Sequence, residues 1–582
     1  MSDEDIFRMT GGEALAEMLR LAGAEVVFGI AGFQLLPFYD AICRAGNRQP
    51  RHILVNDERT GAFAADAFAR VSGKIGFCDG TLGPGATNLT TGLVEAATAG
   101  IPVVALIGDA NRDHSGKNMT QETCQAEILA PIAKELIRVE RGPRIPEFMR
   151  RAFGTATAGR PGPVVLNIPE DIAHKKWEFP QDDFYVDENI RSLPSRRIRP
   201  DAQELKKAAA LLRKAKRPVL LVGGGIHLSG AYAAILDFAQ KLNVPVAHTL
   251  SGKGAVPCAH PLCLNLFGRY DRVANGFIKS ADLLIGLGCK FGEIATIRYT
   301  LIPKEVDLVH IDITPEEIGR YQRVKVGLWA DARSALVDLL DEVIESAGTQ
   351  RKMRAGYMAE IQEKKKEWQE KNRERLTSNE KPVHMARLCH ELTKAMPQNG
   401  ILVADGGFAA HWTGLLYDAP AAGRSFVANR GNASIGYGVP GGIGAQLAAK
   451  EAPVIAITGD GGFNMSMGGL ETAIRERIPA VWVIVNNAAC GYVKGLQHAL
   501  FQGRYQSSDL KEINYANIAR EMGAQGIRVE DPKDLAQALQ GGIAERSLPT
   551  VIDVVVTRDP ARMLPAADAR AQVKIKEGDR PV

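Results

Sequence analysis

The sequence lacks most features that would set it apart from ordinary globular proteins. Its 71 basic and 67 acidic residues leave a net charge of +4, too small over 582 residues for a nucleic-acid-binding or membrane-surface protein. No run of about 18 apolar residues occurs, so no membrane-spanning helix is expected. The N-terminal MSDEDIFRMTGGEA has neither the basic nor the apolar region of a secretory signal. The eight cysteines form no CxxC pair and no dense framework, which favours a reducing cytoplasm.

Short β-branched apolar runs alternate with helical patterns along most of the chain. Continuous apolar runs of this kind predict buried strands of parallel sheets covered by helices on both faces. The pattern predicts an α/β fold with three doubly wound parallel-sheet domains. The expected strands include the following segments: Val26–Ile30, Val103–Ile107, Val164–Ile168, Val219–Val222, Leu283–Leu287, Val309–Ile313, Val454–Ile457 and Val481–Val485.

Two stretches interrupt this alternation and suggest the domain limits. Residues 174–201 are polar and contain three prolines, so we interpret them as a linker. Residues 346–382 carry a dense run of charge, which favours a solvated connecting helix. The predicted domains are residues 1–185, 198–345 and 380–560, with a polar, loosely held tail at 561–582.

The strongest local signal is a Gly-Asp-Gly turn followed by a helix and a second strand ending in Asn-Asn. Gly-Asp-Gly alone is a common turn, but here Asp460 and Asn487 each follow a predicted parallel strand. Such strands end at the same sheet edge, so the two side chains are expected to converge. Their oxygens suit Mg²⁺ or Ca²⁺, and the neighbouring glycines let backbone N–H groups reach phosphate oxygens: Gly459, Gly461 and Gly462.

The segment GDGGFNMSMGGLETAIRERIPAVWVIVNN resembles the cofactor motif of thiamine-diphosphate (ThDP) enzymes. The resemblance extends from about Thr10 to Val556 and is to the acetolactate-synthase-like branch. It implies pyrimidine-binding (1–185), central (198–345) and diphosphate-binding (380–560) domains. It also implies that Asp460, Asn487 and the carbonyl of Ala489 hold Mg²⁺, which anchors the diphosphate.

Glu58 stands at the start of a predicted helix, where the helix dipole favours any carboxylate. The family has its catalytic glutamate at this point, in an H-E-x-x-A-A-like context. That carboxyl bonds the pyrimidine ring of the cofactor and favours the tautomer that removes the thiazolium proton. The family's preceding histidine is Asp57 here.

The segment GNASIGYGVP resembles the family's G-x-x-G-x-M-G-x-G-x-P run, with Ile435 at the position of the apolar wedge that bends the cofactor. Ordinary core packing is the alternative for this side chain. The resemblance also implies that Gly436, and Gly406 and Gly407 after another strand, contact the cofactor. The segment TLGPGATN matches the family's S-G-P-G-A-T-N loop with Gly83, Gly85 and Asn88, and Gln121 matches the glutamine of F-Q-E although the phenylalanine is missing.

The chain departs from acetolactate synthase where substrate choice is made. The family's methionine is Tyr492 here, and its tryptophan is Leu496. Ala31 replaces the proline of an early G-I-P-G-G loop. Tyr492 and Lys494 either bind an unusual, anionic acceptor or are solvent-exposed lid residues.

The middle domain resembles the family's central domain, which carries FAD in some members. Its glycine turn, Gly223 to Gly225, is a weak signal, and the family's R-F-D-D stretch is Lys290-Phe291-Gly292-Glu293 here. Bound FAD and a purely structural domain therefore both remain open.

The leading hypothesis is a ThDP- and Mg²⁺-dependent carboligase of acetolactate synthase type. It would decarboxylate pyruvate or a related 2-oxoacid and transfer the C2 enamine fragment to a carbonyl acceptor. The alternatives are a C–C lyase or decarboxylase, an acyl transfer of the sulfoacetaldehyde acetyltransferase kind, and a non-catalytic homologue. Because Glu58 and the metal motif lie in different domains, the resemblance implies a homodimer or homotetramer with its active site at the subunit interface.

Overall fold

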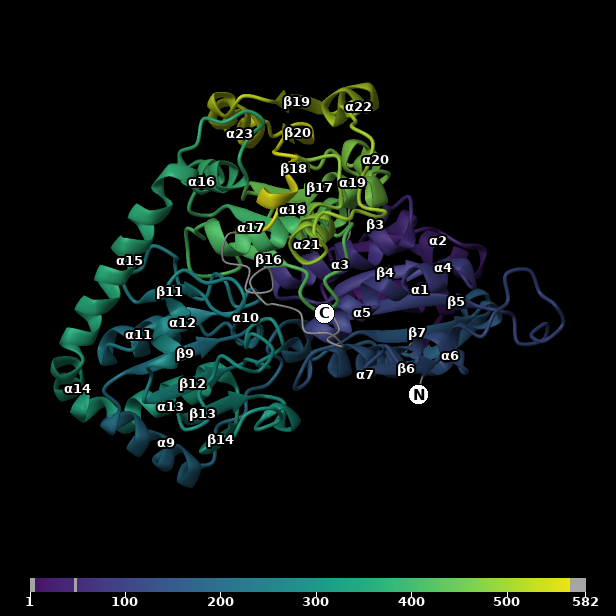
Figure 1. Cartoon of the computed structure of the whole chain (residues 1–582). Helices are drawn as coiled ribbons and strands as arrows, with labels where there is room; N and C mark the ends of the chain where they lie inside the picture. Colours follow the sequence, from purple (N-terminus) through teal and green to yellow (C-terminus); the bar gives the residue numbers. More distant parts are fainter. Residues whose placement is uncertain (1–5, 47–49, 566–582) are drawn as a thin grey trace.

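The computed structural model describes residues 6–46 and 50–565 and contains three six-stranded parallel sheets with helices on both faces (Figure 1). The first sheet has the order β3-β2-β4-β5-β7-β6. Its strands are β2 (Val26–Gly29), β3 (Arg51–Leu54), β4 (Gly76–Gly80), β5 (Val103–Asp109), β6 (Glu135–Arg138) and β7 (Val164–Pro169). Its helices are α1 (Gly11–Leu21), α2 (Leu36–Ala45), α3 (Glu58–Ser72), α4 (Pro84–Asn88), α5 (Thr90–Ala99), α6 (Gln125–Leu129), α7 (Ile145–Thr157) and α8 (Glu170–His174).

The second sheet has the order β11-β10-β9-β12-β13-β14. Its strands are β9 (Pro218–Val222), β10 (Val246–His248), β11 (Cys263–Leu266), β12 (Leu283–Leu287), β13 (Asp307–Asp312) and β14 (Val326–Trp329). The helices of this part are α9 (Ala202–Lys214), α10 (Gly225–Ser229), α11 (Tyr232–Leu242), α12 (Ala274–Lys279) and α13 (Ala332–Val343). The predicted connecting helix follows as α14 (Ala347–Met353) and the long, charged α15 (Ala355–Leu376), which crosses to the third sheet at the edge of the molecule in Figure 1.

The third sheet has the order β16-β15-β17-β18-β20-β19. Its strands are β15 (Ile401–Ala404), β16 (Phe426–Ala428), β17 (Val454–Gly459), β18 (Val481–Asn486), β19 (Gln525–Val529) and β20 (Thr550–Val555). Its helices are α16 (Met385–Ala395), α17 (Phe408–Leu416), α18 (Gly438–Ala448), α19 (Asp460–Ser466), α20 (Gly469–Arg475), α21 (Gly491–Leu500), α22 (Tyr515–Met522) and α23 (Leu535–Ala544). The predicted α/β fold with three parallel sheets is confirmed, whereas the residue limits of the domains stay a prediction.

The first and third sheets share one hydrophobic core, formed where α3 and α18 pack together. Gly444 is required in this contact, because a Cβ there would overlap the carbonyl oxygen of Ala64. Small residues on both helices therefore allow the two backbones to approach closely.

Two local expectations were wrong in part. Residues 176–180 of the expected linker form β8 (Lys176–Pro180), which pairs antiparallel with β1 (Ile6–Thr10). The polar residues of β8 face outward while Phe179 enters the core of the first domain, so polarity alone was misleading. The expected loose tail is packed as far as residue 565: Met563 is buried, and its carbonyl accepts a hydrogen bond of 3.1 Å from the Trp412 indole. Residues 566–582 lie outside the described part.

Among the described helices, none combines the length and apolar character needed to cross a bilayer.

Candidate functional site

The predicted metal ligands come together at the carboxyl edge of the third sheet. β17 and β18 are neighbours, with Gly459 opposite Val485, so Asp460 at the start of α19 and Asn487 just after β18 lie side by side. The backbone N–H groups of residues 487–489 act to lower the pKa of the Asp460 carboxyl, against the larger opposite effect of its burial. The Gly461 N–H donates to Asp460 Oδ1 at 2.8 Å.

The environment of Asp460 fits a cation. Its Oδ2 is buried and has no hydrogen-bond partner among the described residues, and burial raises the pKa of the carboxyl to about 6. Ala488, between the two other predicted ligands, has a φ of +52°, a conformation a non-glycine residue holds only when its surroundings impose it. Residues 6–46 and 50–565 contain no cluster of three His, Cys, Asp or Glu suited to a metal. A set of one carboxylate, one amide and one carbonyl suits Mg²⁺.

Glycines beside this pair leave space that no protein atom fills. A Cβ at Gly459 would meet nothing within 4 Å, and one at Gly461 would meet only Leu510 at 3.5 Å. Packing within the chain therefore does not explain these glycines, whereas a close ligand would. Gly462 is different, because its Cβ would overlap the carboxylate of Asp405.

Asp405 joins the three predicted diphosphate loops and was not singled out from the sequence as a site residue. Its buried carboxylate accepts hydrogen bonds from the N–H groups of Gly406 (2.7 Å), Gly436 (3.1 Å) and Tyr437 (3.0 Å) and from the Thr458 hydroxyl (2.6 Å). The available signal was its place between a buried strand and two glycines. The carboxylate holds Gly406 and Gly436 in adjacent turns beside α19.

Ile435, next to Gly436 in these loops, is exposed to solvent. Its side chain is 41% exposed, and a Cβ at Gly407 would lie 3.5 Å from its Cγ2. This exposure does not fit ordinary core packing, the alternative reading of the residue.

A second group of predicted residues surrounds Glu58 at the start of α3. Asp57 caps the helix by accepting a hydrogen bond from the Arg59 N–H, and the buried Glu58 side chain points into the first domain. Asn88 Nδ2 donates to Glu58 Oε2 at 3.0 Å, and a Cβ at Gly85 would lie 3.3 Å from Glu58 Oε1. Glu58, Gly85 and Asn88 therefore form one cluster.

Gly83 contacts Gln121 through backbone rather than through the glutamine side chain. Gly83 has a φ of +65°, and a Cβ there would overlap the carbonyl oxygen of Gln121, whose side chain is exposed. The loop is held instead by the buried Gln125, whose Oε1 accepts from the Gly83 N–H at 2.8 Å and whose Nε2 donates to Asn167 at 2.7 Å. Gln125 gave no signal in the sequence beyond its proximity to Gln121.

Within one chain the two groups are linked through neighbouring residues, because Arg59, next to Glu58, donates to the Met465 carbonyl on α19 at 2.9 Å. Among the described residues, no hydrogen bond or ion pair links Glu58 or Asn88 to Asp460 or Asn487.

The predicted substrate residues follow strands of two different sheets, β2 of the first sheet and β18 of the third. Ala31 is exposed after β2, and Leu496 is half-buried on α21. The Tyr492 ring packs edge-on against His411, with centroids 4.6 Å apart. Lys494 forms an ion pair with Asp509, so its charge is already partnered.

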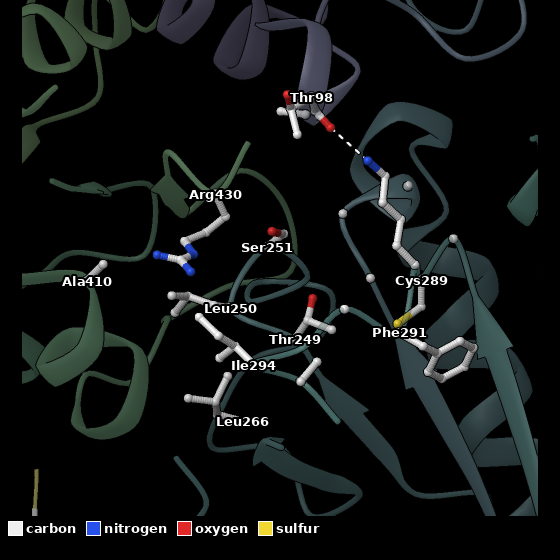
Figure 2. A pocket seen from close by; sticks show the side chains of 18 of the residues that line it. Thr98, Thr249, Leu250, Ser251, Leu266, Cys289, Phe291, Ile294, Ala410 and Arg430 are labelled. Carbon is white, nitrogen blue, oxygen red and sulfur yellow. Dashed lines mark hydrogen bonds between the residues drawn. The ribbon is translucent and has the colours of Figure 1, made fainter. Parts of the chain in front are cut away.

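A cavity of about 420 Å³ lies among all three domains (Figure 2). Its wall includes the glycine turn at residues 223–225, and Lys290 donates from the same wall to the Thr98 carbonyl at 2.8 Å. Arg424 and Arg430 also line it, and burial lowers the pKa of both guanidinium groups. Among the described residues, neither guanidinium has a hydrogen-bond or ion-pair partner, although the carboxylates of Glu95 and Glu293 act on Arg430 and that of Asp66 acts on Arg424 from a distance.

Three family models match the chain, together covering more than half of it. They are the thiamine pyrophosphate enzyme N-terminal TPP-binding domain (residues 9–128), central domain (205–339) and C-terminal TPP-binding domain (405–554). A probable acetolactate synthase large subunit of Methanocaldococcus jannaschii is 34% identical, over 96% of this chain and 93% of the relative. The acetolactate synthase large subunit of Corynebacterium glutamicum is 31% identical, over 99% and 91% respectively.

These matches run through both clusters of predicted residues and through the domain that contributes the glycine turn of the cavity. The chain belongs to the thiamine pyrophosphate enzymes and is a ThDP-dependent enzyme of the acetolactate synthase type.

Proposed function

We propose that this enzyme is a Mg²⁺-dependent carboligase that joins a fragment of pyruvate, or of a related 2-oxoacid, to a carbonyl acceptor. The observation that carries the proposal is the unpartnered, buried Oδ2 of Asp460 beside Asn487, next to the unfilled space at Gly459. Asp460, Asn487 and the carbonyl of Ala489 would hold the metal. Glycines 406, 407, 436, 459, 461 and 462 would receive the diphosphate.

Bound ThDP supplies a nucleophilic carbon that stores the electron pair released when a 2-oxoacid loses carbon dioxide. The side chains of this protein would position the cofactor and hold the proton that its pyrimidine ring requires. Glu58 would hold a proton on its carboxyl group facing the pyrimidine ring, while Asn88 fixes the orientation of that carboxyl through Oε2. Ile435 would support the bent cofactor from its exposed position. Gly83, Gly85 and Gln121 would form the wall on the side of the first domain.

Tyr492, Leu496, Lys494 and Ala31 would shape the acceptor site, and their identities favour an acceptor different from that of branched-chain amino-acid synthesis. Because Lys494 is paired with Asp509, Tyr492 is the better candidate for a direct polar contact with the acceptor.

The test is incubation of the ThDP- and Mg²⁺-loaded enzyme with a panel of 2-oxoacids and carbonyl acceptors, with products identified by mass spectrometry. A new carbon–carbon bond between donor fragment and acceptor supports the carboligase. Release of the free aldehyde, cleavage without ligation, or acyl transfer to phosphate would replace it with a decarboxylase, a lyase or an acetyltransferase. If none of the 2-oxoacids were consumed, all of these activities would be contradicted.

We also propose that two copies of the chain build each site, Glu58 coming from one and the metal ligands from the other. Met465 and Val493, near the metal loop, are each 47% exposed, and such apolar surface is expected to be covered. Mixed dimers of Glu58→Gln and Asp460→Asn chains test this, because one of their two sites would be intact. Refolded mixtures should recover up to about a quarter of wild-type activity. No recovery would assign the site to a single chain.

The cavity among the domains is proposed to hold FAD. Its two unpartnered guanidinium groups, from Arg424 and Arg430, suit a diphosphate, and the turn at residues 223–225 allows close backbone approach. Flavin absorbance in the heat-denatured supernatant, or a thermal shift on adding FAD that Arg430→Ala abolishes, would support it. If neither signal is observed, the central domain has a structural role and holds no FAD. A cytoplasmic location is part of the same proposal, since all eight cysteines carry free thiols.

A further inference from the structure

A buried glutamate of the first domain holds the loop that carries Ile435. Glu95 lies on α5, is fully buried, and is absent from both clusters described above. Its Oε1 accepts from the Gly431 N–H at 2.7 Å, and its Oε2 accepts from the N–H groups of Asn432 (2.6 Å) and Ala433 (3.2 Å). Three successive backbone donors therefore converge on one carboxylate, the arrangement by which backbone N–H groups bind an anion.

The loop is shaped for this contact. A Cβ at Gly431 would overlap the carbonyl oxygen of Glu95, and Ala433 has a φ of +56°. Ile435 follows two residues later, and Gly436 is held from its other side by Asp405. The backbone that presents Ile435 is thus fixed at both ends by a buried carboxylate.

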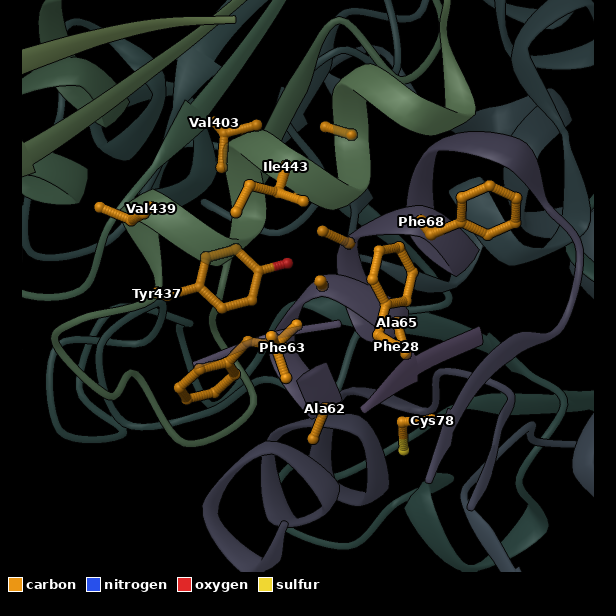
Figure 3. Packing of buried hydrophobic residues seen from close by; sticks show 14 of the residues in the cluster. Phe28, Ala62, Phe63, Ala65, Phe68, Cys78, Val403, Tyr437, Val439 and Ile443 are labelled. Atoms are coloured by element: carbon orange, nitrogen blue, oxygen red, sulfur yellow. The ribbon is translucent and has the colours of Figure 1, made fainter. Parts of the chain in front are cut away.

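A nearby ion cluster of the first domain also contacts the third domain by hydrogen bonds and provides a comparison. Arg70 binds Asp66 (2.6 Å) and Glu95 (2.8 Å), and the Tyr437 hydroxyl donates to Asp66 at 2.8 Å. Figure 3 shows Tyr437 packed against Phe63 in this interface. Asp66 bonds to a side chain of the third domain, that of Tyr437. Glu95 instead bonds to backbone N–H groups of the loop.

We propose that Glu95 is a positioning residue for catalysis, which sets the place of Ile435 and so the bend of the cofactor. The inference rests on the proposed role of Ile435. Both oxygens of Glu95 act only as acceptors, so the NH₂ group of a Glu95→Gln side chain must face an N–H donor on either side. The loop would then move away and Ile435 with it.

The test measures exchange of the C2 proton of bound ThDP with D₂O, followed by NMR after acid quench at saturating ThDP and Mg²⁺. Glu95→Gln is expected to slow exchange about ten- to a hundredfold, as a misplacement of about 1 Å would. Asp171→Asn is the control: Asp171 is also a buried, arginine-paired carboxylate of the first domain, bound by Arg112 at 2.6 Å, and does not touch the loop. It should lower thermal stability while exchange stays at the wild-type rate.

Gly431→Ala provides a second variant if Glu95→Gln does not fold, since it moves the loop while leaving the carboxylate in place, and it should show the same defect. Wild-type exchange in a folded Glu95→Gln or Gly431→Ala protein would overturn the proposal and make Glu95 a domain contact only. If Ile435→Ala also exchanges at the wild-type rate, the role of Ile435 is refuted as well; a slowed Ile435→Ala with normal Glu95→Gln refutes the Glu95 inference alone.

Discussion

Replacing Asp405 tests whether one carboxylate holds the proposed diphosphate loops together. Its Oδ1 accepts from Gly406 and Tyr437, and its Oδ2 accepts from Gly436 and the Thr458 hydroxyl. In Asp405→Asn, the amide NH₂ would take the Oδ2 side, where the Thr458 hydroxyl can rotate to accept. Only the Gly436 N–H then loses its acceptor, which costs about 1–3 kcal/mol. Burial raises the pKa of Asp405, so losing the charge itself adds little to the cost.

The comparison variants set the scale. Thr458→Val removes one donor and should cost about 1 kcal/mol, while Asp405→Ala leaves three backbone N–H groups without an acceptor and should cost roughly three times as much as Asp405→Asn. Urea unfolding followed by circular dichroism gives the free energies, and calorimetric titration gives the affinity for ThDP, expected to fall in the same order. If Asp405→Ala unfolded at the wild-type urea concentration, the Asp405 carboxylate would not hold these loops together.

Three further substitutions address other parts of the molecule. Glu58→Gln should lower kcat by about 10²- to 10⁴-fold with ThDP affinity little changed, and full turnover in steady-state assays would remove Glu58 from catalysis. Burial lowers the pKa of His384 to about 4, below its unfolded value of 6.5, so the unfolded state binds the extra proton between these pH values and stability falls as pH drops from 6.5 to 4. His384→Asn, which can still cap α16, should remove up to about 3 kcal/mol of that acid sensitivity in urea titrations at a series of pH values, and an unchanged slope would contradict the assignment. Gly444→Ala should destabilise by about 1–3 kcal/mol through overlap with Ala64, whereas Gly541→Ala, with nothing within 4 Å, should be neutral or stabilising by calorimetry, and equal effects would contradict the close packing of α3 and α18.

The sequence was sufficient for the parallel sheets and for the residues directly after their strands. Continuous apolar runs predict buried parallel strands, and the carboxyl ends of neighbours such as β17 and β18 must lie together. The convergence of Asp460 with Asn487 followed from this geometry. The capping box of α1 was predictable for a similarly local reason: the Glu13 carboxylate accepts from the Thr10 N–H at 2.6 Å.

Contacts between distant segments left no such local signal. Glu95 and Gly431 are separated by more than 300 positions, and their bond depends on how the domains dock. Gln125 has ordinary sequence surroundings, and both Gln125 and Asp405 bind backbone N–H groups, which all residue types except proline offer. The strand β8 was hidden by its polar outward face, because only Trp177 and Phe179 turn inward.

Calorimetric titration of ThDP tests whether Asp460 and Asn487 bind a divalent cation that anchors the cofactor. With Mg²⁺ present the wild-type protein should bind ThDP. Either chelation of the metal or the Asp460→Asn substitution should weaken binding by at least roughly thirtyfold, the cost of removing one partner from a buried charged contact. Equal affinity with and without Mg²⁺, in both proteins, would show that these two residues do not anchor ThDP through a metal ion.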